Sequence, residues 1–181
     1  MHRKLTTQLT LATLVSAALA IGSWYTGWWD IKTQRVPRST VDLRDGALKL
    51  KGSTSPFTGI MFEQAQGGQR ISEVPVWRGK VHGIARGWHS NGQLEVEEPF
   101  INGLSNGLRT RWHPNGKIRS TTTIVKGVLN GPYTEWHDNG QKALEMTLLN
   151  GKGEGLSQAW QPDGTPKSKV TLKAGEPIKT E

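Results

Sequence analysis

The sequence predicts an all-β fold, an elongated antiparallel meander of stacked β-hairpins preceded by an N-terminal hydrophobic helix. Tryptophans recur every 24 residues, at Trp88, Trp112, Trp136 and Trp160. Glycines follow them in the same phase, at Gly92, Gly116, Gly140 and Gly164. A fixed period of this length indicates a tandem array of supersecondary units. The glycine spacing extends the array to about five units, of which the first is degenerate.

Each unit contains the signature of a tight hairpin turn. In His-Pro-Asn-Gly, residues 113–116, the proline suits the first position of a type I turn and the asparagine tolerates the second. Gly116 can then take the left-handed conformation that closes a three-residue loop. This loop would place Trp112 opposite Ile118. A two-residue loop would place Trp112 opposite Arg119 and put charge on the aromatic face, so we favour the longer loop.

The strand after each turn alternates apolar and polar residues, as a half-buried strand should. Leu94, Val96 and Phe100 are predicted to share one face, with Glu95 and Glu97 on the other. A single hairpin is marginally stable in water and cannot bury its apolar side alone. We therefore expect successive hairpins to stack, so that their tryptophans and aliphatic residues cover one another.

The segment GLRTRWHPNGKIRSTTTIVKGVLNG, residues 107–131, resembles the MORN-repeat variant, in which an aromatic residue, an Asn-Gly turn and a Gly-x-x-x-Gly linker recur. The lead-in SPFTGIMFE, residues 55–63, resembles the entry to such arrays. The resemblance implies an all-β meander that contacts membranes or proteins and has no catalytic residues. Many bacterial members carry the label YwqK-type antitoxin. Other MORN-repeat proteins commonly have Tyr-x-Gly-x-Trp at the position where this chain has Trp-His. We therefore do not extend to this chain the lipid binding described for those proteins.

The N-terminal segment differs in character from the array. Arg3 and Lys4 precede a stretch without formal charge from Leu5 to Trp29. Residues 1–29 are predicted to form a transmembrane anchor that ends in an aromatic belt. The alternative is a signal peptide cleaved near Ala20, which would release the protein. In both cases we expect the repeat domain on the periplasmic or extracytoplasmic side.

The remaining chain divides into two parts. Residues 30–54 are predicted to form a linker and a small capping hairpin at 41–52, because the end of a stacked array needs a polar lid. Residues 55–181 are predicted to form the array.

The basic residues are unevenly distributed. Residues 1–58 contain eight Lys and Arg against three acids, whereas the rest of the chain contains 15 Lys and Arg against 12 acids. The array therefore lacks the strong basic stripe of a nucleic-acid-binding protein, and its basic excess lies beside the predicted anchor.

No catalytic, cofactor-binding or metal site is predicted. The chain has no cysteine, so disulfides and thiolate metal sites are excluded. His89, His113 and His137 also recur every 24 residues. Equivalent positions in adjacent hairpins are two strands apart, about 10 Å, which is too far for shared zinc ligation.

We therefore interpret the tryptophans and turn glycines as structural repeat positions. Four side chains that vary between units are the candidates for contact with a partner: Arg86, Arg109, Arg111 and Tyr133. The predicted function is that of a non-catalytic, membrane-tethered module that binds an unknown protein partner in the cell envelope. The alternative, taken from the resemblance, is an antitoxin or immunity protein that neutralises a toxin by binding it. No small-molecule substrate is indicated.

Overall fold

The computed structural model describes residues 34–178, and these form an all-β unit with one short 3-10 helix, η1 (Arg38–Thr40). The anchor or signal segment predicted at residues 1–29 lies outside the described residues. No helix within residues 34–178 is long and apolar enough to cross a membrane.

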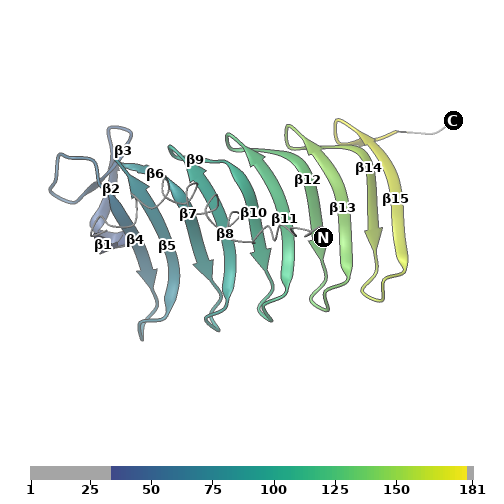
Figure 1. Ribbon diagram of the computed structural model, residues 1–181, viewed down its shortest axis with the longest axis horizontal. Coiled ribbons are helices and arrows are strands. Elements are labelled where there is room, and N and C mark those ends of the chain that lie inside the picture. The colour runs from purple at the N-terminus through teal and green to yellow at the C-terminus, as the bar shows by residue number, and fades with distance from the viewer. Residues whose placement is uncertain (1–33, 179–181) are drawn as a thin grey trace, which may run out of the picture. The chain divides into compact units, whose positions relative to one another are not determined.

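Five consecutive hairpins form the sheet (Figure 1). They are β4 (Gly59–Gln64) with β5 (Arg70–Trp77), β7 (Gly83–Trp88) with β8 (Leu94–Ile101), β10 (Gly107–Trp112) with β11 (Ile118–Val125), β12 (Val128–Trp136) with β13 (Lys142–Leu149), and β14 (Lys152–Trp160) with β15 (Pro166–Lys173). Short strands β6 (Lys80–Val81), β9 (Leu104–Ser105) and β16 (Glu176–Pro177) lie in the returns after three of the hairpins. The predicted antiparallel meander is confirmed.

The turn at each hairpin tip is the predicted three-residue loop. The backbone N–H of His113 donates to the carbonyl of Lys117 at 2.8 Å, and that of Gly116 donates to His113 at 2.9 Å. Gly116 has φ +81°, in the left-handed region that glycine adopts without strain. Trp112 pairs with Ile118, as expected for this loop length.

A β-bulge follows every turn, and it corrects one prediction. Leu94 pairs with Trp88, whereas Val96 pairs with Gly87, so Glu95 is an extra residue on its strand. Gly87 and Trp88 are adjacent and therefore point to opposite faces of the sheet. The expectation that Leu94 shares a face with Val96 was thus wrong, because the bulge reverses the alternation between them.

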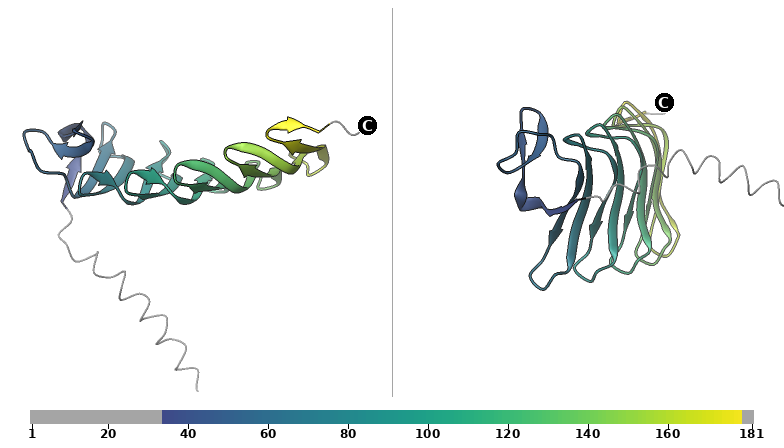
Figure 2. Two further views of the ribbon diagram at one scale, coloured as in Figure 1. Left: turned by 90° about the horizontal axis from the view of Figure 1, so that it is seen from above. Right: turned by 60° about the vertical axis from the view of Figure 1, so that its left-hand side comes forward.

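The sheet is a single layer (Figure 2), and its two faces differ. We call the side bearing Trp88, Trp112, Trp136 and Trp160 the tryptophan face. The other side carries the first glycine of each hairpin, such as Gly107, and we call it the glycine face. The buried residues of the hairpin strands that are not glycine lie on the glycine face: Met61, Val76, Ser120, Thr122, Ile124, Leu148 and Ser157. The indoles are half-buried.

A compact core closes the N-terminal end of the array. Strand β1 (Arg35–Pro37) pairs in parallel with β4, and β2 (Val41–Arg44) pairs with β3 (Ala47–Leu50) around an Asp-Gly turn. Val36, Val41, Phe57, Met61 and Val76 pack together in this core. Because Val36 and Met61 point to the glycine face, the β2–β3 hairpin covers that face of the first unit.

Candidate functional site

The repeated histidines join each hairpin tip to the next one. The Nε2 of each donates to the backbone carbonyl of the tryptophan one repeat later: His89 to Trp112 at 2.9 Å, His113 to Trp136 at 2.8 Å and His137 to Trp160 at 3.0 Å. The backbone ladders between the hairpins end one residue before these tryptophans, for example at Arg111 and Glu135. The imidazoles therefore continue the connection where the backbone ladder stops.

Each repeated asparagine makes two hydrogen bonds at its hairpin tip. The Oδ1 of Asn115 accepts from the backbone N–H of Lys117 at 3.0 Å, which stabilises its own turn. Its Nδ2 donates to the carbonyl of Asp138 in the next tip at 2.7 Å. Asn91 and Asn139 make the equivalent pairs of bonds. Trp-His-x-Asn-Gly is thus a turn sequence that also cross-links neighbouring repeats.

These bonds give the histidines a structural role. Each imidazole bonds to the backbone of the next unit, and no group of three or more His, Asp or Glu side chains within residues 34–178 is placed to hold a metal ion.

The tryptophan face carries an exposed aliphatic surface. Twelve large apolar residues are exposed in the described part of the chain, and strand pairing places nine of them on this face. Their exposed fractions lie between 43% and 56%. The nine are Ile84, Ile101, Leu104, Leu108, Ile118, Val125, Val128, Leu149 and Leu156.

All but Ile118 of these nine residues lie at the end of the hairpins away from the tips. We call these eight the aliphatic band: Ile84, Ile101, Leu104, Leu108, Val125, Val128, Leu149 and Leu156. They occupy repeat positions, since Ile84, Leu108 and Leu156 follow a repeat glycine and Ile101, Val125 and Leu149 end the second strand. Contiguous exposed apolar surface of this kind marks interaction sites in proteins.

A hollow of about 320 Å³ lies beside the band. It is lined by Pro132, Thr134, Glu145, Met146, Thr147, Leu156 and Gln158. Pro132 and Leu156 stand at equivalent positions of neighbouring units, so the hollow lies between two rungs of the array. It can receive a side chain that projects from a partner.

The four candidate contact residues do not form one site. Arg109, Arg111 and Tyr133 lie on the glycine face, whereas Arg86 lies on the tryptophan face. Arg86 donates to Glu97 at 2.6 Å, and the Arg109 guanidinium lies 3.7 Å from the Glu98 carboxylate. Two of the four are therefore engaged in ion pairs with neighbouring strands.

Tyr133 donates its phenolic hydrogen to Glu135 at 3.0 Å. Burial raises the pKa of Tyr133, and the negative charge of Glu135 raises it further. Tyr133 is consequently a neutral donor at physiological pH. This hydrogen bond joins two side chains of β12 on the glycine face.

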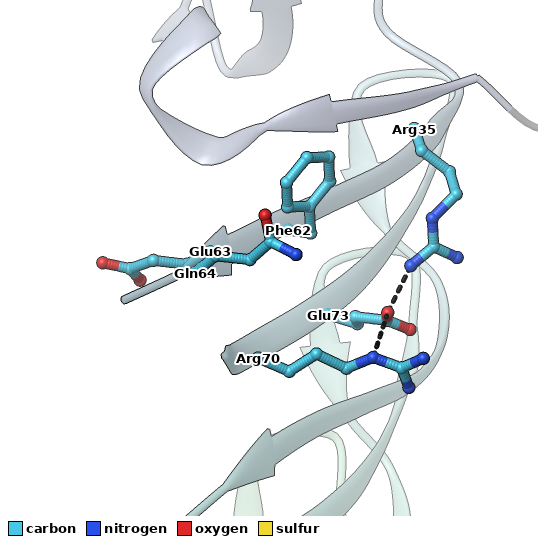
Figure 3. Close-up of a pocket in the computed structure, with 6 residues that line it drawn as sticks. All are labelled: Arg35, Phe62, Glu63, Gln64, Arg70 and Glu73. Atoms are coloured by element: carbon cyan, nitrogen blue, oxygen red, sulfur yellow. Dashed lines mark hydrogen bonds and ion pairs between the residues drawn. The ribbon is translucent and has the colours of Figure 1, made fainter. Parts of the chain in front are cut away.

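A second hollow, also about 320 Å³, lies on the first hairpin (Figure 3). It is lined by Arg35, Phe62, Glu63, Gln64, Arg70 and Glu73. Figure 3 shows Arg35 and Arg70 converging on Glu73: Arg35 forms an ion pair with it, and the Arg70 Nε lies 3.9 Å from its Oε1. Because Arg35 belongs to β1, this ion network ties β1 to the first hairpin, and we assign it a structural role.

Sequence reasoning missed the aliphatic band. The signal was present, since an aliphatic residue follows the first repeat glycine in four of the five hairpins. Hydrophobic alternation alone does not reveal which face of a single-layer sheet stays uncovered.

Comparison with known proteins supports the repeat assignment. No curated protein and no solved structure matches this chain. Three consecutive stretches of the array, residues 81–102, 105–126 and 129–150, match the family model described as the MORN repeat variant, which confirms the resemblance over these three units.

Proposed function

We propose that this chain is a non-catalytic interaction module that binds a protein partner in the cell envelope and is tethered to the membrane by residues 1–29. The alternative suggested by the resemblance, neutralisation of a toxin, would use the same binding surface with the toxin as the partner.

The exposed aliphatic side chains of the tryptophan face carry this proposal. Removing apolar surface from water contributes about 25 cal/mol per Å², so eight aliphatic residues in one band offer a partner a substantial driving force. The glycine face offers no comparable patch, since its apolar residues are buried or half-buried. The function therefore depends on one face of the sheet.

Capture experiments with face-specific variants test the binding proposal. Leu108→Asp and Val128→Asp place a charge in the aliphatic band, and Leu43→Asp is the matched control on the exposed β2 strand. Each full-length variant is used as bait in envelope extracts after its unfolding midpoint has been compared with wild type. We expect the band variants to lose a protein that wild type and Leu43→Asp retain. Equal capture by all four baits would contradict the proposal.

The tether has its own test. The full chain is expected to remain in the membrane fraction through a carbonate wash, because an uncleaved apolar segment of about twenty residues resists extraction. Recovery of a soluble chain that begins at Ile21 would establish the cleaved signal peptide instead.

A further inference from the structure

We infer that the glycine face of the third hairpin, β10 with β11, binds the carboxylate group of a small molecule through Arg109, Arg111 and Arg119. This site lies on the face opposite to the aliphatic band. The inference therefore goes beyond the proposed function and does not depend on it.

Three arginines lie close together on this hairpin. Arg109 and Arg111 stand two residues apart on β10 and both point to the glycine face, about 7 Å apart along the strand. Arg119 is the extra residue of the β11 bulge, so it lies opposite Arg111 together with Ser120. Three guanidinium groups can therefore reach one ligand placed over Ser120.

The electrostatics of Tyr133 support this arrangement. Tyr133 pairs with Thr122 and points to the glycine face of β12. Burial and the charge of Glu135 raise the pKa of Tyr133, and the charges of Arg119 and Arg111 partly offset that rise. Two arginines from different strands thus lie near enough to one phenol to affect its ionisation.

The donors of these arginines are unused within residues 34–178. None of the three guanidinium groups donates a hydrogen bond to another described residue. The side chain of Arg109 is only 23% exposed, and it lies 3.7 Å from the Glu98 carboxylate, which is too far for a hydrogen bond. A guanidinium carries five N–H donors, and burying donors without acceptors is unfavourable. The oxygens of an anionic ligand would supply these acceptors.

Two small hydroxyl side chains lie beside the arginines of β10. Ser120 pairs with Arg111, and Thr122 pairs with Arg109, all on the glycine face. Ser120 is 9% exposed and Thr122 is 2% exposed. In the described chain the Oγ1 of Thr122 is buried without a hydrogen-bond partner, which is rare in folded proteins. A ligand oxygen seated between Arg109 and Tyr133 would give this hydroxyl an acceptor.

The two facing arginines are not required by the repeat. Like charges directly opposite each other on neighbouring strands are destabilising, and Arg111 faces Arg119. The corresponding pairs in the other hairpins carry no two positive charges: Glu63 with Ile71, Gly87 with Glu95, Glu135 with Ala143, and Ala159 with Lys167. The repulsion is specific to the third hairpin, and a bound anion would relieve it.

The net charge of the cluster favours a ligand with one negative charge. Glu98 and Glu135 lie on the glycine face of the flanking strands β8 and β12, so three arginines and two glutamates leave one positive charge. A phosphate monoester carries up to two negative charges and would be repelled by both glutamates. A carboxylate carries one, and its two oxygens match the fork of a guanidinium.

Acetate is the probe that tests this site. The full chain with Tyr25→Phe is held in nanodiscs of uncharged lipid and titrated with sodium acetate. Acetamide, inorganic phosphate and chloride are the controls, all at one ionic strength. Two quantities are measured: the thermal unfolding midpoint at pH 8 and the midpoint of Tyr133 phenolate absorbance. A flotation assay with anionic vesicles is the lipid arm.

We expect acetate to raise the unfolding midpoint relative to chloride, because a ligand that binds only the folded state stabilises it. Acetate should also raise the Tyr133 midpoint, since a nearby anion disfavours the phenolate. Acetamide should change neither midpoint, and phosphate should act more weakly than acetate. Combining Arg111→Gln with Arg119→Gln should weaken the apparent acetate affinity about tenfold or more, the loss expected for charge-assisted hydrogen bonds.

Two comparisons separate binding from a structural role. Arg86→Gln removes an arginine of the tryptophan face and should leave the response to acetate unchanged. In chloride alone, the double variant should unfold at a higher temperature than the parent chain, because the repulsion between Arg111 and Arg119 is gone.

Four results would each overturn the inference: acetate acting as chloride does, acetamide acting as acetate does, an undiminished response in the double variant, or binding of anionic vesicles with no response to acetate. None of them bears on the protein partner of the tryptophan face. Capture by Leu108→Asp tests that partner separately.

Discussion

The Nε2 of His113 lies 2.8 Å from the carbonyl oxygen of Trp136, in the next hairpin of the array. Because a carbonyl oxygen only accepts, the imidazole must donate, so one side chain joins two repeats at their tips. The same bond recurs one repeat earlier and one repeat later. The stability of this array therefore depends on side-chain bonds between units as well as on backbone ladders.

Replacing this histidine should weaken the coupling between hairpins. We expect His113→Ala to lower the free energy of unfolding by about 1 kcal/mol, the usual net contribution of one hydrogen bond. Gln161→Ala is the matched control, since Gln161 holds the histidine position of the last unit and its side chain makes no hydrogen bond within residues 34–178. Urea unfolding measures the free energy of unfolding of both variants and of wild type. Equal loss in the two variants would mean that the tip bonds contribute nothing.

The turn glycine should tolerate substitution poorly. Gly116 has φ +81°, and a Cβ there would also meet the Gln93 side chain. We predict that Gly116→Val costs on the order of 1–2 kcal/mol, because a side chain in the left-handed region is strained. Pro114→Ala keeps the turn geometry and should cost less. Thermal midpoints of the two variants compare them, and equal midpoints would contradict the loop assigned here.

The tryptophans contribute to stability in proportion to their partial burial. Truncating a fully buried tryptophan to alanine costs 3–5 kcal/mol, so the half-buried Trp112 should lose roughly 2 kcal/mol as Trp112→Ala. Trp160→Ala should lose less, because its hairpin is the last in the described chain and Trp112 has a hairpin on each side. Differential scanning calorimetry measures the unfolding midpoints of both variants. An unchanged midpoint for Trp112→Ala would show that the indole is not a structural element.

Tyr133 should titrate above its ordinary range. Its pKa is raised by burial and by the charge of Glu135, so its contribution to stability is complete below about pH 10 and is lost as pH rises through the folded-state value. In a Tyr25→Phe background Tyr133 is the sole tyrosine. Phenolate absorbance should then show a midpoint above 10, and Glu135→Gln should lower it. No change on removing Glu135 would leave burial as the only cause.

The period, the hairpins and the loop type were predictable because each depends on local turn chemistry. The left-handed Gly116 closes the loop that sets Trp112 opposite Ile118. The bulge was not predictable, since the extra residue is Glu95 in one unit and Arg119 in the next, and its identity carries no signal.

The candidate site was less predictable than the fold. The role of His113 requires the register between hairpins, which no single repeat contains. The exposure of Leu108 depends on the absence of a second layer over the tryptophan face, which alternation cannot reveal. Arg109 and Arg111 vary between units, yet they lie on the face opposite to Leu108.

Site-specific photocrosslinking tests most directly which face of the sheet binds the partner. A benzoylphenylalanine at Leu108 points from the tryptophan face, and one at Arg111, three residues along the same strand, points from the glycine face. Both positions are exposed, so the two probes have comparable access to a partner. On irradiation of intact cells, we predict a discrete crosslinked protein from position 108 and none from position 111. Crosslinking from position 111 alone would contradict the assignment of function to the tryptophan face.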